Sequence, residues 1–268
     1  MSGLLGVCHL GPTPYGVGLA LQEALLRRCA RAREGAAGPD GGPDGEGRSA
    51  PDDVAGITDW LLFPDHPPVL TVGRGGSEAS LRVSREALAA RGVELFEVSR
   101  GGDMTWHGPG QLVGYPVVDL ARVGRDLHAF LRALEDVLVE ALAGWGLAAG
   151  RVPGRTGVWA GEEKVASIGI AVRSWVSYHG FALNVAPDLA FFDLIHPCGL
   201  RGVRMTSLRE RLGPAAPDLA AARRAVAGLL ARRLGYAGTR SVPAGVVRKL
   251  ASGIESRLSG SPTRPHAA

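Results

Sequence analysis

The chain has 268 residues, of which 46% are hydrophobic, so it can bury a full core as one large domain or as one domain with appendages. It contains no apolar run of the roughly 18 to 20 residues that a membrane span needs, and its first residues lack the pattern of a signal peptide. We therefore expect a cytoplasmic protein.

The charge and the cysteines exclude several further classes. The net charge of +4 suits an acidic protein partner, whereas nucleic acid is disfavoured because the arginines are dispersed and no nucleic-acid motif accompanies them. The cysteines Cys8, Cys29 and Cys198 are an odd number at scattered spacing, which matches neither a disulfide framework nor a paired metal signature. We expect no metal site, and any cysteine chemistry should be thiol chemistry.

The first part of the chain predicts a strand at residues 4–10 and a helix from about residue 14 to 33, whose leucines recur on one face. Residues 35–55 change character, because Gly, Pro, Asp and Glu leave almost nothing to bury, and they predict a disordered surface insertion. Two strands follow at 60–63 and 69–73, joined by a turn at 66–68. Ser84 is predicted to cap a short helix that ends near residue 91, and 93–98 form the next strand.

A glycine-rich stretch follows, with the sequence RGGDMTWHGPGQLVGYPVVDL at residues 100–120. Its glycines allow sharp turns and close approach of the backbone to a ligand, and the apolar run at 111–120 predicts a buried strand that holds the loop. A long hairpin connection, in which Gly and Pro only form turns, is the alternative. The arginine, histidine, threonine and glutamine among these residues favour a binding loop.

Beyond this loop, residues 126–145 predict the longest helix, which packs one apolar face on the sheet. Strand-like runs at 156–160, 164–175 and 178–185, with short turns between them, predict an antiparallel meander. Lys164 opens the middle run. Only Lys164 and Lys249 are lysine among 30 basic residues, and lysine, unlike arginine, can lose its proton in a buried site. Lys164 is thus a candidate for proton chemistry, with a leftover surface lysine as the alternative.

Cys198 is the candidate nucleophile, because it lies between Pro197 and Gly199 in a polar setting where an inert, buried cysteine is not expected. A nearby ammonium lowers the pKa of a thiol, and Lys164 would supply it if the meander folds back onto this loop. A structural cysteine in a turn is the alternative. His179 and His196 also leave a Cys–His pair open.

These motifs together resemble a known family. The segments are HPPVLTVGR, RGGDMTWHGPGQLVGYP, TGVWAGEEKVASIGI, YHGFALNV and HPCGLRGVRMTSL. In this order they resemble the octanoyltransferase family, the lipoyl(octanoyl) transferases of lipoate biosynthesis. The likeness is dense over residues 60–212, and RGGxxTxHGPGQ is its most specific part. The insertion at 35–55 and the tail beyond Tyr236 depart from the family pattern without touching these motifs.

The resemblance implies the α+β fold of biotin and lipoate protein ligases, with a mixed, largely antiparallel sheet flanked by helices. We expect one catalytic domain at residues 1–236 and a partly disordered tail at 237–268. The implied activity is a two-step acyl transfer that needs no cofactor. Cys198 attacks octanoyl-acyl carrier protein, and the acyl group then passes to a lysine on a lipoyl domain of a 2-oxoacid dehydrogenase or of the glycine cleavage H protein.

The resemblance also assigns roles to residues. Lys164 matches the family residue that lowers the thiol pKa. The stretches that match the acyl pocket are Arg100, Gly101, Gly102, Asp103, Met104, Thr105, Trp106 and His107, then Ser167, Ile168 and Gly169, and finally Gly180, Phe181 and Ala182. Glycines would let an acyl chain lie against backbone, and strand-end amides would donate to the oxyanion that forms at a thioester carbonyl.

Two other functions remain open at this point. An ATP-dependent lipoate or biotin ligase would share the fold but would activate a free acid, and it would not need Cys198. A non-catalytic module that binds acyl carriers or lipoyl domains would keep its partners after loss of Cys198. Chain-length preference, oligomeric state and the choice of lipoyl domain are not predicted.

Overall fold

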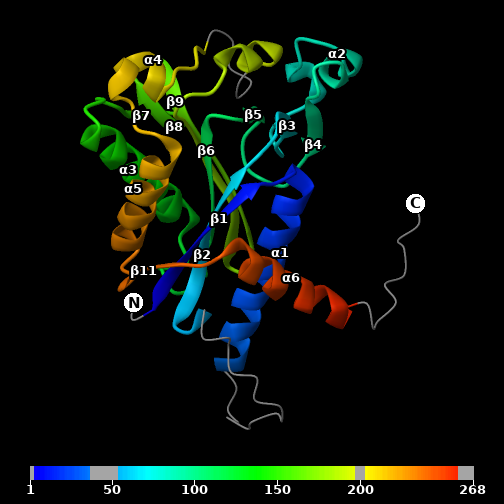
Figure 1. Cartoon of the computed structure of the whole chain (residues 1–268), viewed down its shortest axis with the longest axis vertical. Helices are drawn as coiled ribbons and strands as arrows, with labels where there is room; N and C mark the ends of the chain where they lie inside the picture. The colour runs from blue at the N-terminus through cyan, green and yellow to red at the C-terminus, as the bar shows by residue number, and fades with distance from the viewer. Residues whose placement is uncertain (1–2, 37–53, 197–202, 259–268) are drawn as a thin grey trace.

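The structure, a computed structural model, describes residues 3–36, 54–196 and 203–258 (Figure 1). Its main sheet has eight strands in the order β11-β1-β2-β6-β10-β9-β8-β7. They are β1 (Leu4–Pro12), β2 (Ile57–Asp65), β6 (Gln111–Val117), β7 (Gly150–Val152), β8 (Arg155–Ala160), β9 (Glu163–Arg173), β10 (Val176–Asn184) and β11 (Gly238–Ser241). β1 pairs in parallel with β2 and β11, and the other neighbours are antiparallel. The sheet is therefore mixed and largely antiparallel, as predicted.

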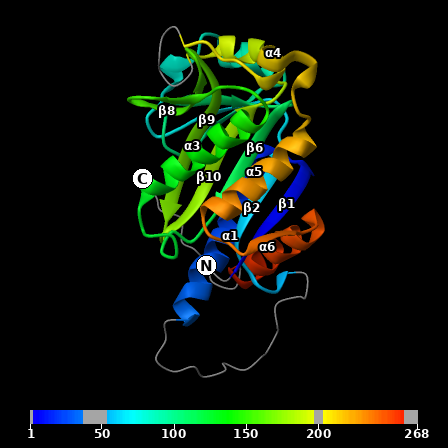
Figure 2. The ribbon, with the colours of Figure 1, turned by 90° about the vertical axis from the view of Figure 1, so that its left-hand side faces the viewer.

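Helices cover both faces of this sheet (Figure 2). α3 (Leu127–Gly144) and α5 (Leu219–Arg233) pack on one face, and α1 (Tyr15–Ala36) and α6 (Ala244–Leu258) pack on the other. Every residue of β6 and β10 is buried, because these central strands are covered on both sides. None of the described helices is both long and apolar enough to cross a membrane.

A second, three-stranded sheet lies beside the upper end of the main sheet in Figure 1 and has the order β4-β3-β5. Its strands are β3 (Val69–Val72), β4 (Glu94–Glu97) and β5 (Met104–His107). Two short helices accompany it, α2 (Arg85–Ala89) and the 3-10 helix η3 (Leu189–Leu194), and a further short helix, α4 (Leu208–Leu212), follows later in the chain. Leu70, Leu88 and Trp106 belong to the separate core of this small sheet.

Many predicted elements are found. The meander is β8-β9-β10, and the side chains of Ser84 and Asp126 cap α2 and α3 by accepting hydrogen bonds from backbone amides. Two expectations were wrong. α1, with 22 residues, is longer than α3, with 18. Residues 104–107, predicted as part of a loop, form β5. The segment is short and stands among glycines, so its strand character depends on antiparallel pairing with β3.

The predicted domain limits also change. β11 lies in the segment 237–268 that we expected to be a tail, yet it pairs with β1, and Val247 of α6 is fully buried in the main core. The sheet therefore continues past the expected boundary at residue 236. Of the predicted insertion 35–55, the first two residues belong to α1 and Val54 is buried. Residues 37–53 and 259–268 lie outside the described part of the chain.

Candidate active site

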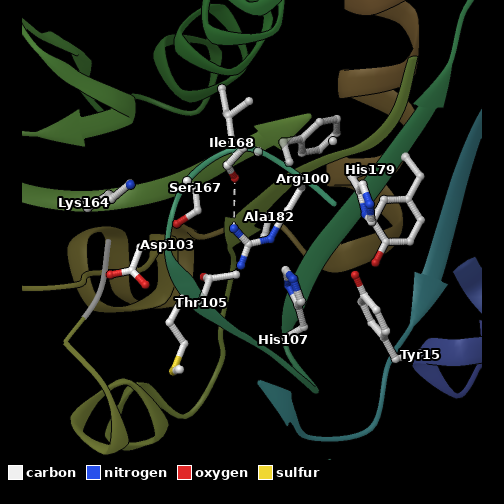
Figure 3. A pocket seen from close by; sticks show the side chains of 17 residues that line it. Tyr15, Arg100, Asp103, Thr105, His107, Lys164, Ser167, Ile168, His179 and Ala182 are labelled. Atoms are coloured by element: carbon white, nitrogen blue, oxygen red, sulfur yellow. Dashed lines mark hydrogen bonds between the residues drawn. The ribbon is translucent and has the colours of Figure 1, made fainter. Parts of the chain in front are cut away.

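A narrow pocket lies where the small sheet meets β9 and β10 (Figure 3). The glycine-rich loop and β5 form one wall, and the paired strands β9 and β10 form the other. It is lined by Tyr15, Arg100, Gly101, Gly102, Asp103, Met104, Thr105, His107, Tyr115, Lys164, Ser167, Ile168, Gly169, His179, Gly180, Phe181 and Ala182. Segments far apart in the sequence thus meet around one cavity.

Arg100 holds the glycine-rich loop in place. Its side chain is 7% exposed, and its guanidinium donates to the carbonyl oxygen of Thr71 at 2.6 Å, to the Thr71 hydroxyl at 2.8 Å and to the Gly101 carbonyl at 3.0 Å. The backbone adds further bonds, since Arg74 donates to the Arg100 carbonyl and Gly75 to the Gly102 carbonyl, both at 3.0 Å. The loop is therefore tied to the end of β3 and presents a fixed surface to the pocket.

Two glycines let this loop lie directly on β9. Gly102 has a φ of +82°, a conformation that L side chains rarely adopt. At Gly169 an added Cβ would lie 2.8 Å from the carbonyl oxygen of Gly101, which is too close for a real contact. The amide of Gly101 also donates to the Ile170 carbonyl at 3.0 Å. A side chain at Gly169 would push the loop away and change the pocket wall.

Lys164 lies at one end of the pocket, near Ser167 and Asp103 (Figure 3). It is 3% exposed, and its Nζ lies 5.6 Å from the centroid of the Trp159 ring. Its backbone amide donates to the Arg204 carbonyl at 2.9 Å, and its carbonyl accepts from the Thr206 amide at 3.0 Å. The beginning of β9 therefore holds the segment at 204–206 beside the lysine.

Cys198 lies outside the described residues, as do the other residues at 197–202. The chain on both sides is anchored. Before them, the amide of His196 donates to the Ser80 carbonyl at 2.7 Å, and Ile195 forms a β-bridge with Leu81. After them, Met205 forms a parallel bridge with Lys164. The predicted nucleophile, Cys198, therefore stands seven positions before Met205, the residue that pairs with Lys164.

A chain of buried side chains connects this anchored segment to the pocket wall. The Asn184 amide donates to the Thr206 carbonyl at 3.0 Å, and the Gln111 amide donates to the Asn184 side-chain oxygen at 2.9 Å. The side-chain oxygen of Gln111, Oε1, lies 2.8 Å from Nδ1 of His107. Because each member is buried and hydrogen-bonded, the network fixes the segment after Cys198 relative to the pocket.

The two described cysteines are poor nucleophiles. Cys8 is fully buried, and burial raises the pKa of its thiol to about 11. Cys29 is 3% exposed, and burial likewise raises its pKa well above the usual value. Both thiols stay protonated at neutral pH, and only the thiolate is a strong nucleophile. Neither of the two described thiols is therefore suited to nucleophilic catalysis.

The opposite end of the pocket carries uncharged histidines and tyrosines. Burial lowers the pKa of His66 to about 4 and those of His107 and His179 to about 3, and it raises the pKa of Tyr15 to about 12. His66, which follows β2, does not line the pocket itself, but its Nε2 lies 2.8 Å from the hydroxyl of the lining residue Tyr115 and its Nδ1 lies 2.7 Å from the Thr13 carbonyl. All of these side chains are neutral at pH 7, and the positive charge of Arg100 in the same pocket also lowers the pKa of His107 and His179.

The structure brings together nearly all of the residues predicted for the acyl pocket. Trp106 is the exception: Thr105 and His107 line the pocket, whereas Trp106 is fully buried in the core of the small sheet and stacks on Phe191, with ring centroids 5.0 Å apart. Sequence reasoning did not place Tyr15, Tyr115 and His179 in the pocket. Among these only the histidine, beside the glycine of YHGFALN, carried a signal.

The sequence matches a known protein family and several of its members. Residues 14–229 match the family described as the lipoyl protein ligase A/B catalytic domain. An octanoyltransferase of Geobacter metallireducens is 52% identical over 183 residues, which are 67% of this chain and 82% of the relative. An octanoyltransferase of Caldicellulosiruptor bescii is 42% identical over 211 residues, which are 78% and 82% of the two chains.

Solved structures share the fold at lower identity. A lipoate-protein ligase A bound with ATP superposes with a TM-score of 0.67 at 19% identity and covers 98% of this chain and 97% of its own. A chain from an archaeal lipoylation system of Thermoplasma acidophilum, a bi-partite lipoate protein ligase and its E2 lipoyl domain, has a TM-score of 0.65 at 17% identity, with full coverage of both chains. The predicted likeness to the lipoate protein ligase fold is confirmed.

Proposed function

Because the chain belongs to the lipoyl protein ligase A/B catalytic-domain family, among its octanoyltransferases, we propose that it moves an octanoyl group from octanoyl-acyl carrier protein to a lipoyl-domain lysine through a thioester on Cys198. The observation that carries the proposal is the buried Lys164, which lines the pocket and holds the segment after Cys198 by backbone hydrogen bonds. The pocket then receives the acyl chain.

In the first step the Cys198 thiolate attacks the carbonyl carbon of the octanoyl thioester. The Lys164 ammonium favours this thiolate, because an adjacent positive charge lowers a thiol pKa. The bond between the carbonyl carbon and the carrier's sulfur breaks, and the departing thiolate takes the proton of the ammonium. The products are the octanoyl thioester of Cys198, the carrier thiol and a neutral lysine amine.

In the second step the amine of the acceptor lysine attacks the acyl-enzyme. It forms an amide, gives up one proton to the neutral Lys164 amine and expels the Cys198 thiolate, which restores the starting pair. A thioester is already activated for acyl transfer, so both steps balance without ATP. We propose lipoyl domains of 2-oxoacid dehydrogenases and the glycine cleavage H protein as acceptors; a relative of the same fold was solved in a lipoylation system with an E2 lipoyl domain.

The test is mass spectrometry of the intact protein and its peptides after exposure to octanoyl-acyl carrier protein. We expect one octanoyl group on the Cys198 peptide, which disappears when a lipoyl domain is added and appears on that domain. Cys198→Ala should abolish the adduct, while Cys29→Ala, at a buried and protonated thiol, should retain it. Labelling of the lipoyl domain by free octanoate plus ATP, with Cys198→Ala still active, would instead establish an ATP-dependent ligase. Binding of either partner without any transfer would indicate a binding module.

A further inference from the structure

His179 has an unusual conformation for a residue inside a strand. Its φ is +57°, in the left-handed region, although it lies within β10. A non-glycine residue in this region is strained and persists only where surrounding contacts hold it. One such contact is the side-chain oxygen of Gln22, from α1, which accepts from the His179 amide at 2.7 Å. Gln22 is itself fully buried and donates to the Gly18 carbonyl. Helix α1 therefore holds the backbone of His179 in this conformation through the Gln22 side chain.

The side chain of His179 faces the pocket without a hydrogen-bond partner among the described residues. It is 2% exposed, it lines the pocket, and neither ring nitrogen is satisfied within that part of the chain. The ring of Tyr178 packs beside it, with centroids 4.8 Å apart. Strain and an unsatisfied buried imidazole both cost free energy, and a position that retains both is expected to serve a bound ligand.

His179 also stands at the far end of the pocket from Lys164 (Figure 3). On β9 and β10, Ser167 pairs with Ala182 near the lysine, whereas Ile170 pairs with His179. These pairs are three residues apart along the strands, a separation of roughly 10 Å. That distance is comparable with an extended eight-carbon chain whose carbonyl carbon lies near the lysine. The end of such a chain would meet the imidazole.

We propose that His179 determines the length of acyl chain that the pocket accepts, with its ring as the end wall and Gln22 holding that wall in place. This inference rests on the proposed function for the identity of the ligand as a straight-chain acyl thioester. A longer chain would have to displace the ring, whose backbone is clamped by the Gln22 bond.

The test uses acyl-pantetheine thioesters of six to fourteen carbons and two substitutions of His179. His179→Gly removes the ring and suits a positive φ, so the protein should fold and relieve strain. We expect its preference to move from eight to ten or twelve carbons, with a change of at least about 10-fold in the ratio of the two affinities. His179→Phe is the matched control, because it keeps the bulk of the ring and should keep the preference for eight carbons.

Affinity is measured by calorimetry in a Cys198→Ala background, so the result does not depend on formation of a thioester. Acylation of the protein that retains Cys198 is followed separately by mass spectrometry. An unchanged preference in His179→Gly, or an equal loss of affinity for every chain length, would overturn the role of His179. Absence of the Cys198 adduct beside a shifted binding preference would overturn the proposed mechanism and leave the length inference standing.

Discussion

Two buried polar clusters lie at opposite ends of β2, and they differ in how completely they are paired. Near the start of the strand, the fully buried Asp59 accepts from the amide of Asp119 at 2.7 Å and from the hydroxyl of Tyr236 at 2.9 Å. Arg122 lies 3.6 Å from Asp59, and Arg33 lies 3.0 Å from Asp119. This acidic cluster therefore connects β2 with the segment after β6, with α1 through Arg33 and with Tyr236 just before β11. It fits a role in holding the fold.

Beyond the other end of β2 lies a histidine cluster, formed by His107 and His179, which line the pocket, and by His66, which contacts the pocket residue Tyr115. Its members are uncharged at neutral pH, and His179 keeps two unsatisfied nitrogens within the described part of the chain. Buried polar groups in proteins are nearly always hydrogen-bonded, so an exception that faces a cavity indicates a ligand site. Asp119 Oδ2 in the acidic cluster also lacks a hydrogen bond, yet it lies 3.7 Å from Nε of Arg122. The comparison teaches that an opposite charge within reach, rather than polarity, separates the structural cluster from the functional one.

The largest expected effect comes from breaking the acidic cluster. Asp59→Ala leaves the Tyr236 hydroxyl and the Asp119 amide without their partner and removes one of the two carboxylates beside Arg122. Removal of one member of a buried ion pair costs about 3–5 kcal/mol. We expect the free energy of unfolding in urea to fall by this amount. Glu78→Ala removes an exposed ion pair with Arg85 and should leave it nearly unchanged. Equal stability of the two variants would show that the acidic cluster does not hold the fold.

A smaller effect, on chemistry rather than stability, is expected at the lysine. Lys164→Arg keeps a positive charge, so alkylation of Cys198 at neutral pH should stay fast. Transfer to the acceptor should fall by roughly 10²-fold or more, because arginine cannot accept the proton that the attacking amine loses. Single-turnover kinetics measures formation and decay of the acyl-enzyme separately. Formation should slow less than decay, because the carrier thiolate can leave before it is protonated. Unchanged decay would exclude Lys164 from proton transfer.

The histidine cluster should make the protein sensitive to mild acid. The pKa values of His66, His107 and His179 are about 4, 3 and 3, below the roughly 6.5 of an exposed histidine, so the unfolded chain takes up protons first. Their contribution to stability is complete above about pH 6.5 and is lost as the pH falls toward 4, by up to about 1.4 kcal/mol per pH unit for each histidine. Asp59 acts in the opposite direction, because burial raises its pKa.

Urea unfolding between pH 7.5 and pH 4.5 checks this dependence. His179→Phe removes one of the titrating groups and should flatten the slope, whereas His128→Gln, at an exposed position on α3, should leave it as in the parent. A parent protein whose stability does not change between pH 6.5 and 4.5 would contradict the assignment of these histidines as neutral in the folded state. Identical slopes in the parent and in His179→Phe would contradict it for His179 alone.

The sequence predicted the elements whose signals are local. The meander follows from β-branched runs with short turns, and the cap at Ser84 follows from a single residue before a short helical segment. β11 and β5 have four residues each, and they depend on pairing with strands far away in the sequence. No local pattern specifies such partners, so these strands were missed.

The candidate site divides in the same way. Residues of the motifs at 100–107, 167–169 and 180–182 line the pocket because each motif is contiguous, although the face of Trp106 could not be inferred from its place in a motif. Tyr15, Tyr115 and His179 come from α1, β6 and β10, and only tertiary packing brings them together. The left-handed backbone of His179 has no sequence signal, because glycine, the residue that marks such a position, stands one place later.

The smallest effect is expected from the predicted insertion, once its limits are set by the fold. Residues 35–36 belong to α1, while Val54 is 3% exposed in the core and the Ala55 carbonyl accepts from Arg240. Replacement of residues 37–53 by a short Gly-Ser linker should therefore leave both acylation and the melting temperature nearly unchanged, since halving a loop alters closure entropy by only about 0.6 kcal/mol. Val54→Ala, at the border, should instead lower stability by roughly 1–2 kcal/mol through lost apolar burial. Calorimetry gives the melting temperatures of both variants. A linker variant that loses as much stability as Val54→Ala would show that residues 37–53 contribute to the fold.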